Sequence, residues 1–322
     1  MRTVEISHFW QDLLDILPQR IGVLGHVRGD GDSTGSQIAL TRALKLAGKD
    51  ATLFFEKALS ESLQTFIEDT QSQVIEDFAT HEVDGWVIVD CADLKRLPVS
   101  SNKPLLGLVD HHRSTRPYAE LNCIESNYAA TAEILTALFQ ANNLPIDYTT
   151  ANALYLGILT DTGQFTYRNT TAQTLEKAAY LVSQGASPSL VSERIFNQVT
   201  LPQLHLKQLF LKNLHLEIEG KVCIGTLTTQ DFELAKTTPL DAVDFVDRTR
   251  SIKGVLAGAY IEEYQGRIKV SLRSNTDSLK LDELASHFGG GGHAAAAGFT
   301  VNDKDLAIVY KELLDLFRKL MR

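Results

Sequence analysis

The sequence predicts an α/β protein in which a parallel-sheet N-terminal domain is joined by a helical linker to a smaller, mixed-sheet α/β C-terminal domain. At 322 residues, the chain is too long for one typical core. In its first part, short apolar runs alternate with helical patterns, which is typical of a parallel sheet. Later, two apolar runs flank Gln265 and Gly266, which indicates a hairpin. We expect domains at 1–185 and 217–322, a linker at 186–216 and an active site in the cleft between the domains.

The first domain is expected to begin with a helix in Met1–Leu17, because acidic and apolar residues alternate there in an amphipathic pattern. Apolar runs predict strands at Ile21–Gly25, Ala51–Phe55, Trp86–Val89 and Leu105–Val109. Helical periodicity predicts helices at Ser33–Ala47, Thr131–Gln140 and Thr150–Leu159. Asp161 therefore lies just past a helix end.

Beyond these elements, Thr171–Leu216 has a helical pattern that is broken at Gly185 and Pro188. The second domain is expected to contain a strand at Val222–Thr228, a helix at Asp241–Arg250, hairpin strands at Val255–Tyr264 and Arg267–Ser274, and helices at Leu281–Phe288 and Asp303–Leu320. A glycine run and an alanine run lie between the last two helices.

Composition limits the classes of function. The net charge of −9 argues against a broad basic surface for long duplex nucleic acid, but is compatible with a short anionic substrate in a local positive pocket. Cys91, Cys123 and Cys223 are few and scattered, which favours a reducing cytoplasm over a disulfide framework. No run is long and apolar enough to span a bilayer, so we expect no membrane association.

The chemistry starts in the loop His26–Asp32, which carries His26, Asp30 and Asp32. Alternate positions place the two carboxylates on opposite sides of a turn, where they could hold two different cations. An imidazole with carboxylates and no thiolate favours Mn²⁺ or Mg²⁺ over structural Zn²⁺. Taken alone, these residues fit helix caps or turns slightly better than a metal site.

Two further strand ends strengthen the metal interpretation. Asp90 follows one predicted strand, and Asp110-His111-His112 follows the next. The carboxyl ends of parallel strands share one sheet edge, where so many ionisable groups would repel unless cations neutralised them. Asp90 has an alternative role as a helix cap, with Asp93 as a competitor, and His112 could be a structural histidine. Neither alternative explains why these segments coincide.

Together with Asp161 and the segment Gly289–His293, these residues resemble the DHH phosphoesterase family with its DHH-associated C-terminal domain. The resemblance covers nearly the whole chain, and the order and spacing of the motifs agree. Within this family, the length of the chain is similar to that of the oligoribonucleases and pAp phosphatases, which are often called nanoRNases.

The resemblance implies two Mn²⁺ ions, with Mg²⁺ as an alternative, that share Asp90 as a bridging ligand. One ion would be held by His26, Asp30 and Asp90, and the other by Asp32, Asp90, His111 and Asp161. Asp110 would orient a histidine, and His112 would face the scissile phosphate. Water would be activated by both cations and attack in line.

Substrate contacts are expected from Gly290, Gly291, Gly292, His293, Arg273, Arg113 and Ser114. Consecutive glycines let backbone N–H groups approach an anion closely, although a bare glycine run also fits a linker or a packing turn. The guanidinium of Arg273 could bind phosphate through two parallel hydrogen bonds, but the residue fits a solvated charge at a strand end equally well. Ala294 stands where many relatives carry proline. Arg28 is a further candidate or simply faces solvent.

The implied function is cleavage of short RNA oligonucleotides to mononucleotides, together with removal of the 3′-phosphate from pAp to give AMP. A cyclic-dinucleotide or pApA phosphodiesterase is the nearest alternative, because it uses the same metals and C-terminal domain. A family II pyrophosphatase lacks the glycine-histidine segment, and a single-strand DNA exonuclease would carry further domains. A non-catalytic nucleotide sensor usually loses ligands, whereas every expected ligand is present here. The amphipathic helix of the first domain could serve a homodimer.

Overall fold

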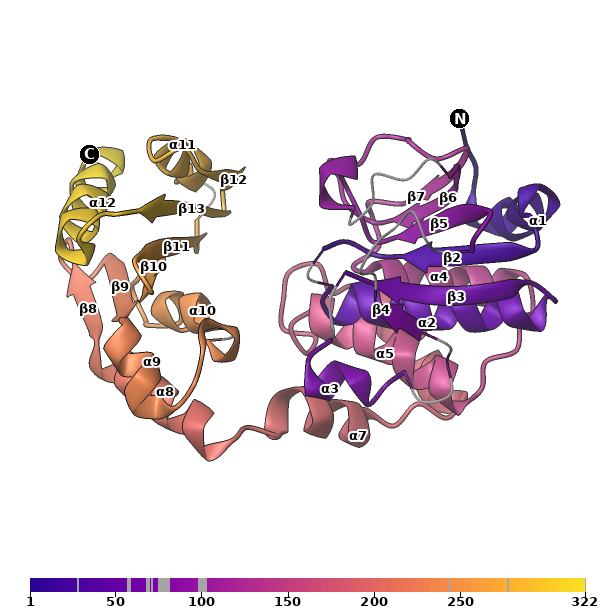
Figure 1. Cartoon of the computed structure of the whole chain (residues 1–322), viewed down its shortest axis with the longest axis horizontal. Coiled ribbons are helices and arrows are strands. Elements are labelled where there is room, and N and C mark those ends of the chain that lie inside the picture. The colour runs from indigo at the N-terminus through magenta and orange to yellow at the C-terminus, as the bar shows by residue number, and fades with distance from the viewer. Residues whose placement is uncertain are drawn as a thin grey trace. The chain divides into compact units, whose positions relative to one another are not determined.

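The computed structural model describes residues 1–27, 29–56, 59–67, 70, 72–74, 82–97, 103–242, 244–276 and 278–321, so Arg28 lies outside the described residues. The chain divides into two compact units, Met1–Gln198 and Val199–Arg322. Each unit has its own sheet and helices (Figure 1). The first sheet is parallel and the second is mixed, so the predicted fold class is confirmed. Within the described part of the chain, no helix has the length and apolar character needed to cross a membrane.

The sheet of the first unit has seven strands in the order β1-β7-β6-β5-β2-β3-β4, and all of its neighbours run parallel. The strands are β1 (Arg2–Thr3), β2 (Arg20–Leu24), β3 (Asp50–Phe55), β4 (Ser72–Val74), β5 (Gly85–Val89), β6 (Leu105–Asp110) and β7 (Leu121–Ile124). The central strands are nearly continuous apolar runs and are buried on both faces, as a parallel sheet requires.

Helices cover the face of this sheet that carries Ile21, Val23 and Val87. The α-helices of the unit are α1 (Ile6–Ile16), α2 (Gly31–Leu46), α3 (Glu61–Gln64), α4 (Thr131–Ala141), α5 (Tyr148–Asp161), α6 (Ala172–Ser183) and α7 (Pro188–Ser192). Figure 1 shows α2, α4 and α5 layered along the sheet. Glycines allow a close approach of α2 to α5, because a Cβ on Gly35 would lie 2.1 Å from the carbonyl oxygen of Ala153.

The strand order has a switch point between β2 and β5. After β2 the chain continues to β3 and β4 on one side, and then returns to β5 on the other side of β2. Ligands of open α/β sheets bind at the carboxyl edge of such a switch point. The segments that follow β2 and β5 carry His26 and Asp90, so the topology brings these two residues together.

The sheet of the second unit has six strands in the order β12-β13-β11-β10-β9-β8, with antiparallel neighbours except for the parallel pair β9 and β10. The strands are β8 (Leu214–Glu217), β9 (Val222–Leu227), β10 (Ala257–Tyr264), β11 (Arg267–Ser274), β12 (Gly291–His293) and β13 (Ala296–Asn302). The helices are α8 (Leu201–Lys212), α9 (Thr229–Ala235), α10 (Phe245–Arg250), α11 (Leu281–Ser286) and α12 (Leu306–Leu320). One face packs against α11 and α12, and the other against α8, α9 and α10.

The structure differs from the sequence expectations at several elements. Asp32 lies in the first turn of α2 and not in the preceding loop, because Asp30 already caps that helix. The helical pattern expected through Leu216 ends earlier, at α8, and β8 follows it. Part of the alanine run forms β13, because its pairing with β11 outweighs the low strand propensity of alanine. The final helix begins at Leu306, since Asp305 is its N-cap.

Candidate metal centre

His26 lies directly beyond β2 and is buried. Its Nδ1 lies 2.8 Å from the carbonyl oxygen of Val27 and donates a proton to it, so Nε2 is the ring nitrogen that faces the carboxylates. Nε2 lies 3.5 Å from Asp30 Oδ2 and 3.5 Å from Asp90 Oδ2. Burial alone would lower the pKa of His26, but hydrogen bonding to Asp30 and Asp90 outweighs it and raises that pKa to about 10.

Asp30 has two roles, one for each of its carboxylate oxygens. Oδ1 accepts the backbone N–H of Ser33 at 3.0 Å and so caps α2, while Oδ2 faces His26. Burial raises the pKa of Asp30, but hydrogen bonding to His26 reverses this effect and leaves the pKa below its usual value. Asp30 is therefore an ionised carboxylate next to a protonated imidazole. A divalent cation could take the place of the imidazole proton that lies between them.

Asp32 lies two residues further on, in the first turn of α2, and is completely buried. Its Oδ2 accepts the backbone N–H of Thr131 at 2.7 Å, and its Oδ1 accepts that of Ala132 at 2.8 Å. Burial and the nearby charge of Asp30 raise the pKa of Asp32, whereas these two amides oppose the shift. A Cβ on Gly157 of α5 would lie 2.7 Å from Asp32 Oδ1, so this glycine gives the carboxylate its space.

Asp90 follows β5 with a left-handed backbone of φ 55°, a conformation that few residues other than glycine adopt. Its Oδ2 faces His26, whereas its Oδ1 lies 3.6 Å from Nε2 of His111. The two oxygens of this one buried carboxylate thus face two different groups of ligands. Burial and the charge of Asp32 raise the pKa of Asp90 to about 7.

The two histidines after β6 have opposite environments. His111 Nε2 lies 3.3 Å from Asp161 Oδ2 and 3.9 Å from Asp32 Oδ2, and burial lowers the pKa of His111. His112 instead turns Nδ1 toward Asp110 Oδ1 at 2.7 Å, and this hydrogen bond raises the pKa of His112. The environment of His111 thus favours the neutral imidazole that a metal requires, whereas that of His112 favours the protonated form.

Asp161 is the last residue of α5, and its side chain is 30% exposed. Burial and the neighbouring charges of Asp32 and Asp90 raise the pKa of Asp161. Three carboxyl groups with raised pKa values thus share one small volume. Such a set is unfavourable when ionised unless a cation neutralises it.

The donor atoms fit divalent cations. The groups whose candidate ligand atoms lie within 4.8 Å of one another are His26 with Asp30 and Asp90, Asp32 with His111 and Asp161, and Asp90 with His111 and His112. In the last group, Nδ1 of His112 is already engaged by Asp110. Carboxylate oxygen and imidazole nitrogen without sulfur suit Mn²⁺ and Mg²⁺. The structure thus brings together all six residues that the sequence suggested as ligands.

The helix that begins at Thr131 was predicted, but the contacts of its first residues with two candidate metal ligands were not. Thr131 donates its hydroxyl to Asp90 Oδ1 at 3.2 Å, in addition to the backbone N–H that it donates to Asp32. The N-cap position of α4 is Ala130, which has no side chain that could cap the helix. A predicted helix without a capping residue was the one signal that its amides are satisfied elsewhere.

The expected substrate residues lie in separate units. Arg113 and Ser114 are exposed in the turn after His112. In the second unit, Ala296 pairs with Arg273 on one side and with His293 on the other, so all three lie in one row across the sheet.

Residues in such a row point to the same face, and two strand spacings separate Arg273 from His293 by about 10 Å. Gly291 and Gly292 precede His293 in β12, where Gly292 has φ 144° and a Cβ would lie 2.5 Å from the carbonyl oxygen of Ala296. Gly290, immediately before the strand, is similarly close to the backbone of Gly298. These glycines permit tight packing of the edge strand next to the row.

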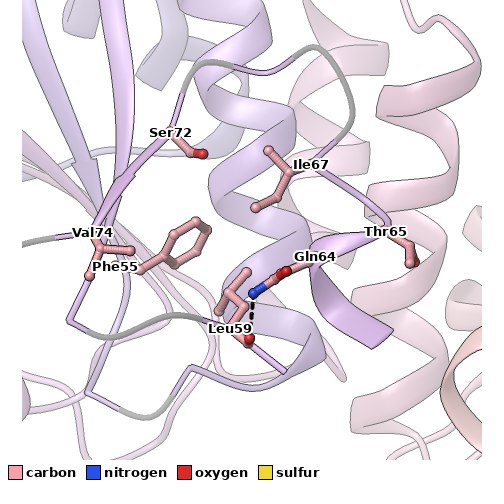
Figure 2. Close-up of a pocket in the computed structure, with 7 residues that line it drawn as sticks. All are labelled: Phe55, Leu59, Gln64, Thr65, Ile67, Ser72 and Val74. Atoms are coloured by element: carbon pink, nitrogen blue, oxygen red, sulfur yellow. Dashed lines mark hydrogen bonds between the residues drawn. The ribbon is translucent and has the colours of Figure 1, made fainter. Parts of the chain in front are cut away.

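A pocket of about 440 Å³ lies on the β3–β4 flank of the first unit. Figure 2 shows Phe55 and Ile67 among its apolar walls, with Gln64 donating to the backbone of Leu59. None of the residues that line it is a candidate metal ligand.

Comparison with known families agrees with this two-domain fold. Residues 20–158 match the DHH family, N-terminal domain, and residues 221–322 match the DHHA1 domain. The chain belongs to the DHH phosphoesterase family, and it is a hydrolase that acts on phosphate ester bonds.

Two relatives share the name bifunctional oligoribonuclease and PAP phosphatase NrnA. The protein from Thermus thermophilus is 28% identical over 311 residues, which cover 96% of this chain and 92% of the relative. The protein from Bacillus subtilis is 27% identical over 291 residues, which cover 88% of this chain and 89% of the relative.

Solved structures share the fold. An exopolyphosphatase-related protein from Bacteroides fragilis has a TM-score of 0.87 at 23% identity, covering 98% of this chain and 96% of that chain. RecJ from Thermus thermophilus, in complex with Mn²⁺, has a TM-score of 0.55 at 14% identity, covering 98% of this chain and 55% of that chain.

Proposed function

We propose that this protein hydrolyses short oligoribonucleotides to mononucleotides and removes the 3′-phosphate from pAp to give AMP, with two Mn²⁺ ions as cofactors. The observation that carries the proposal is the position of Asp90. One of its oxygens faces His26 and the other faces His111, as expected for a carboxylate that two cations share. The names of the relatives from two bacteria support the same pair of substrates.

The two ligand groups would each hold one ion. His26, Asp30 and Asp90 would hold the first, and Asp32, Asp90, His111 and Asp161 would hold the second. When bound, the ions supply a deprotonated water and neutralise charge on the phosphoryl oxygens. The donor set supports Mn²⁺ and equally permits Mg²⁺.

His112 is suited to contact the substrate rather than a metal. Because its Nδ1 is bonded to Asp110, its Nε2 is left to face a phosphoryl or leaving-group oxygen, to which the protonated form of the ring would donate. Asp110 also accepts the hydroxyl of Thr115 through its other oxygen, which fixes the carboxylate behind the imidazole. Asp110 would thus act by holding His112 in one orientation and one charge state.

The second unit would select for short substrates by binding a terminal phosphate. Arg273 and His293 lie in one row, where a guanidinium and an imidazole can contact a terminal phosphate. The neighbouring glycines allow backbone N–H groups to approach the same anion. Arg113 and Ser114 would contact phosphate beside His112. The net charge of −9 favours substrates of a few nucleotides over long strands.

The three free cysteines favour a reducing cytoplasm.

Hydrolysis assays with purified protein and Mn²⁺ test this function. RNA dinucleotides to pentanucleotides, pAp, a long single strand and cyclic di-AMP are compared at equal concentration. We expect rapid loss of the short RNAs and of pAp, with the long strand and the cyclic compound spared. Preference for the cyclic dinucleotide would replace this proposal with turnover of a signalling nucleotide, and binding without hydrolysis would indicate a sensor.

A further inference from the structure

Helix α4 begins next to the metal centre without a cap of its own. It has 11 residues, and its N-cap is Ala130, which makes no side-chain hydrogen bond. The first amides of a helix must find acceptors, and here they find both oxygens of Asp32. Asp32 lies 99 residues earlier in the chain than Thr131, so a candidate metal ligand from α2 caps a distant helix.

The Thr131 side chain extends this contact to a second ligand. The residue is completely buried, and its hydroxyl donates to Asp90 Oδ1. That oxygen is the one that faces His111, whereas Oδ2 faces His26. The hydroxyl therefore fixes which oxygen of the shared carboxylate belongs to which group of ligands.

The start of α4 is itself held in place from two sides. The buried carboxylate of Glu133 accepts the backbone N–H of Ala129 at 2.8 Å and the hydroxyl of Thr174 at 3.2 Å. Asn169 donates its side-chain amide to the carbonyl oxygens of Ala129, at 3.2 Å, and of Asp161, at 3.1 Å. The helix start is thus connected to the backbone of a third candidate ligand.

We propose that Thr131 is a positioning residue for the metal centre, and that the start of α4 holds Asp32 and Asp90 in their ligand geometry before metal binds. The inference rests on the proposed two-metal function. Each oxygen of Asp32 has two lone pairs, so an amide can occupy one and leave the other for a cation. The amides and the hydroxyl also compensate negative charge where no solvent can do so.

The test replaces the hydroxyl without changing the shape of the side chain. Mn²⁺ binding to purified Thr131→Val protein is titrated by electron paramagnetic resonance of the free ion. We expect Mn²⁺ affinity to fall by about tenfold to a hundredfold, the usual range for a lost partner of a metal ligand. Thr131→Ser keeps the hydroxyl and should restore affinity close to that of the wild type.

Thr136 offers a matched control on the same helix. It is also completely buried, but its hydroxyl donates to the backbone of Ala132. Thr136→Val should leave Mn²⁺ affinity unchanged. Thermal unfolding of the metal-free proteins is measured in parallel, because a purely structural role of Thr131 would lower the melting temperature and leave the dissociation constant as it was.

An unchanged dissociation constant in Thr131→Val, beside a wild-type protein that binds two ions, would overturn the inference and leave the proposed function standing. An equal loss in Thr136→Val would also overturn it, because the effect would then belong to the helix as a whole. A wild-type protein that binds no Mn²⁺ would overturn both proposals.

Discussion

The metal-site edge of the first unit and the Arg273–His293 row of the second unit differ in burial. Asp32 and Asp90 are at most 2% exposed, whereas His293 is exposed and Arg273 is half-buried. Buried carboxylates lose water, so their pKa values rise and they need a cation or a donor. The side chains of the row keep more of their hydration until a substrate arrives. This difference agrees with the proposed roles, in which the first region performs the chemistry and the second one captures the substrate.

The largest effect is expected from Asp90→Asn. Asparagine keeps the size of the side chain and tolerates the left-handed backbone, but it cannot supply two anionic ligand oxygens. We expect a loss of about a thousandfold or more in kcat/KM, because two-metal stabilisation contributes several kcal/mol. Asp93→Asn is the matched control, since Asp93 is an exposed cap of the short helix that follows. Turnover in a folded Asp90→Asn protein would contradict the shared-ligand role.

The neighbouring histidines divide the metal-site edge further. His112→Gln should lower kcat by about a hundredfold to ten-thousandfold, the range for a lost proton donor, while Mn²⁺ affinity stays the same. His111→Gln should instead weaken Mn²⁺ binding, because its Nε2 faces Asp161 and Asp32. Kinetics at saturating Mn²⁺ and metal titration separate the two. Equal metal loss in both variants would remove the distinction.

A smaller effect is expected in the second unit. Arg273→Lys retains the charge but loses the planar fork, so KM for the short RNAs should rise about tenfold with kcat nearly intact. His293→Ala should act in the same direction. Steady-state kinetics with dinucleotide and pAp measure both parameters. A fall in kcat at unchanged KM would place the row in the chemistry and break the comparison.

The smallest effect concerns the pH dependence of stability. The carboxyl pKa values of Asp32, Asp90 and Asp161 are raised by folding, so the metal-free folded state holds protons that the unfolded chain has lost. Stability is therefore present at low pH and is lost as pH rises through about 7, the pKa of Asp90.

The melting temperature of metal-free protein should fall by on the order of a few °C between pH 6 and pH 8.5. The additional stabilisation by Mn²⁺ should grow over the same range, because metal binding requires deprotonated ligands. Calorimetry with and without Mn²⁺ measures both trends. A rise in metal-free stability with pH would contradict the raised pKa values.

The fold class and the ends of the central strands could be predicted because buried parallel strands are short apolar runs with polar residues at their carboxyl ends. Asp90 and Asp110 mark such ends in the sequence itself. The alanine run gave no such signal, because alanine and glycine have low strand propensity and only pairing with β11 makes Ala296–Asn302 a strand.

The role of Thr131 could not be predicted from the sequence. Threonine at a helix start is a common residue, and its acceptors come from α2 and from the end of β5. Periodicity describes neighbours along the chain, whereas this contact depends on how helices α2 and α4 pack. Likewise, the opposite pKa shifts of His111 and His112 follow from side-chain direction and not from their adjacent positions.

The left-handed backbone at Asp90 restricts which amino acids evolution or protein engineering can place there. Glutamate is usually treated as interchangeable with aspartate, but its longer chain cannot hydrogen-bond locally in a way that eases a positive φ. Asparagine and glycine suit the backbone, yet neither supplies a carboxylate. Aspartate combines a backbone preference for this conformation with a carboxylate, so a library that varies this position should return it most often.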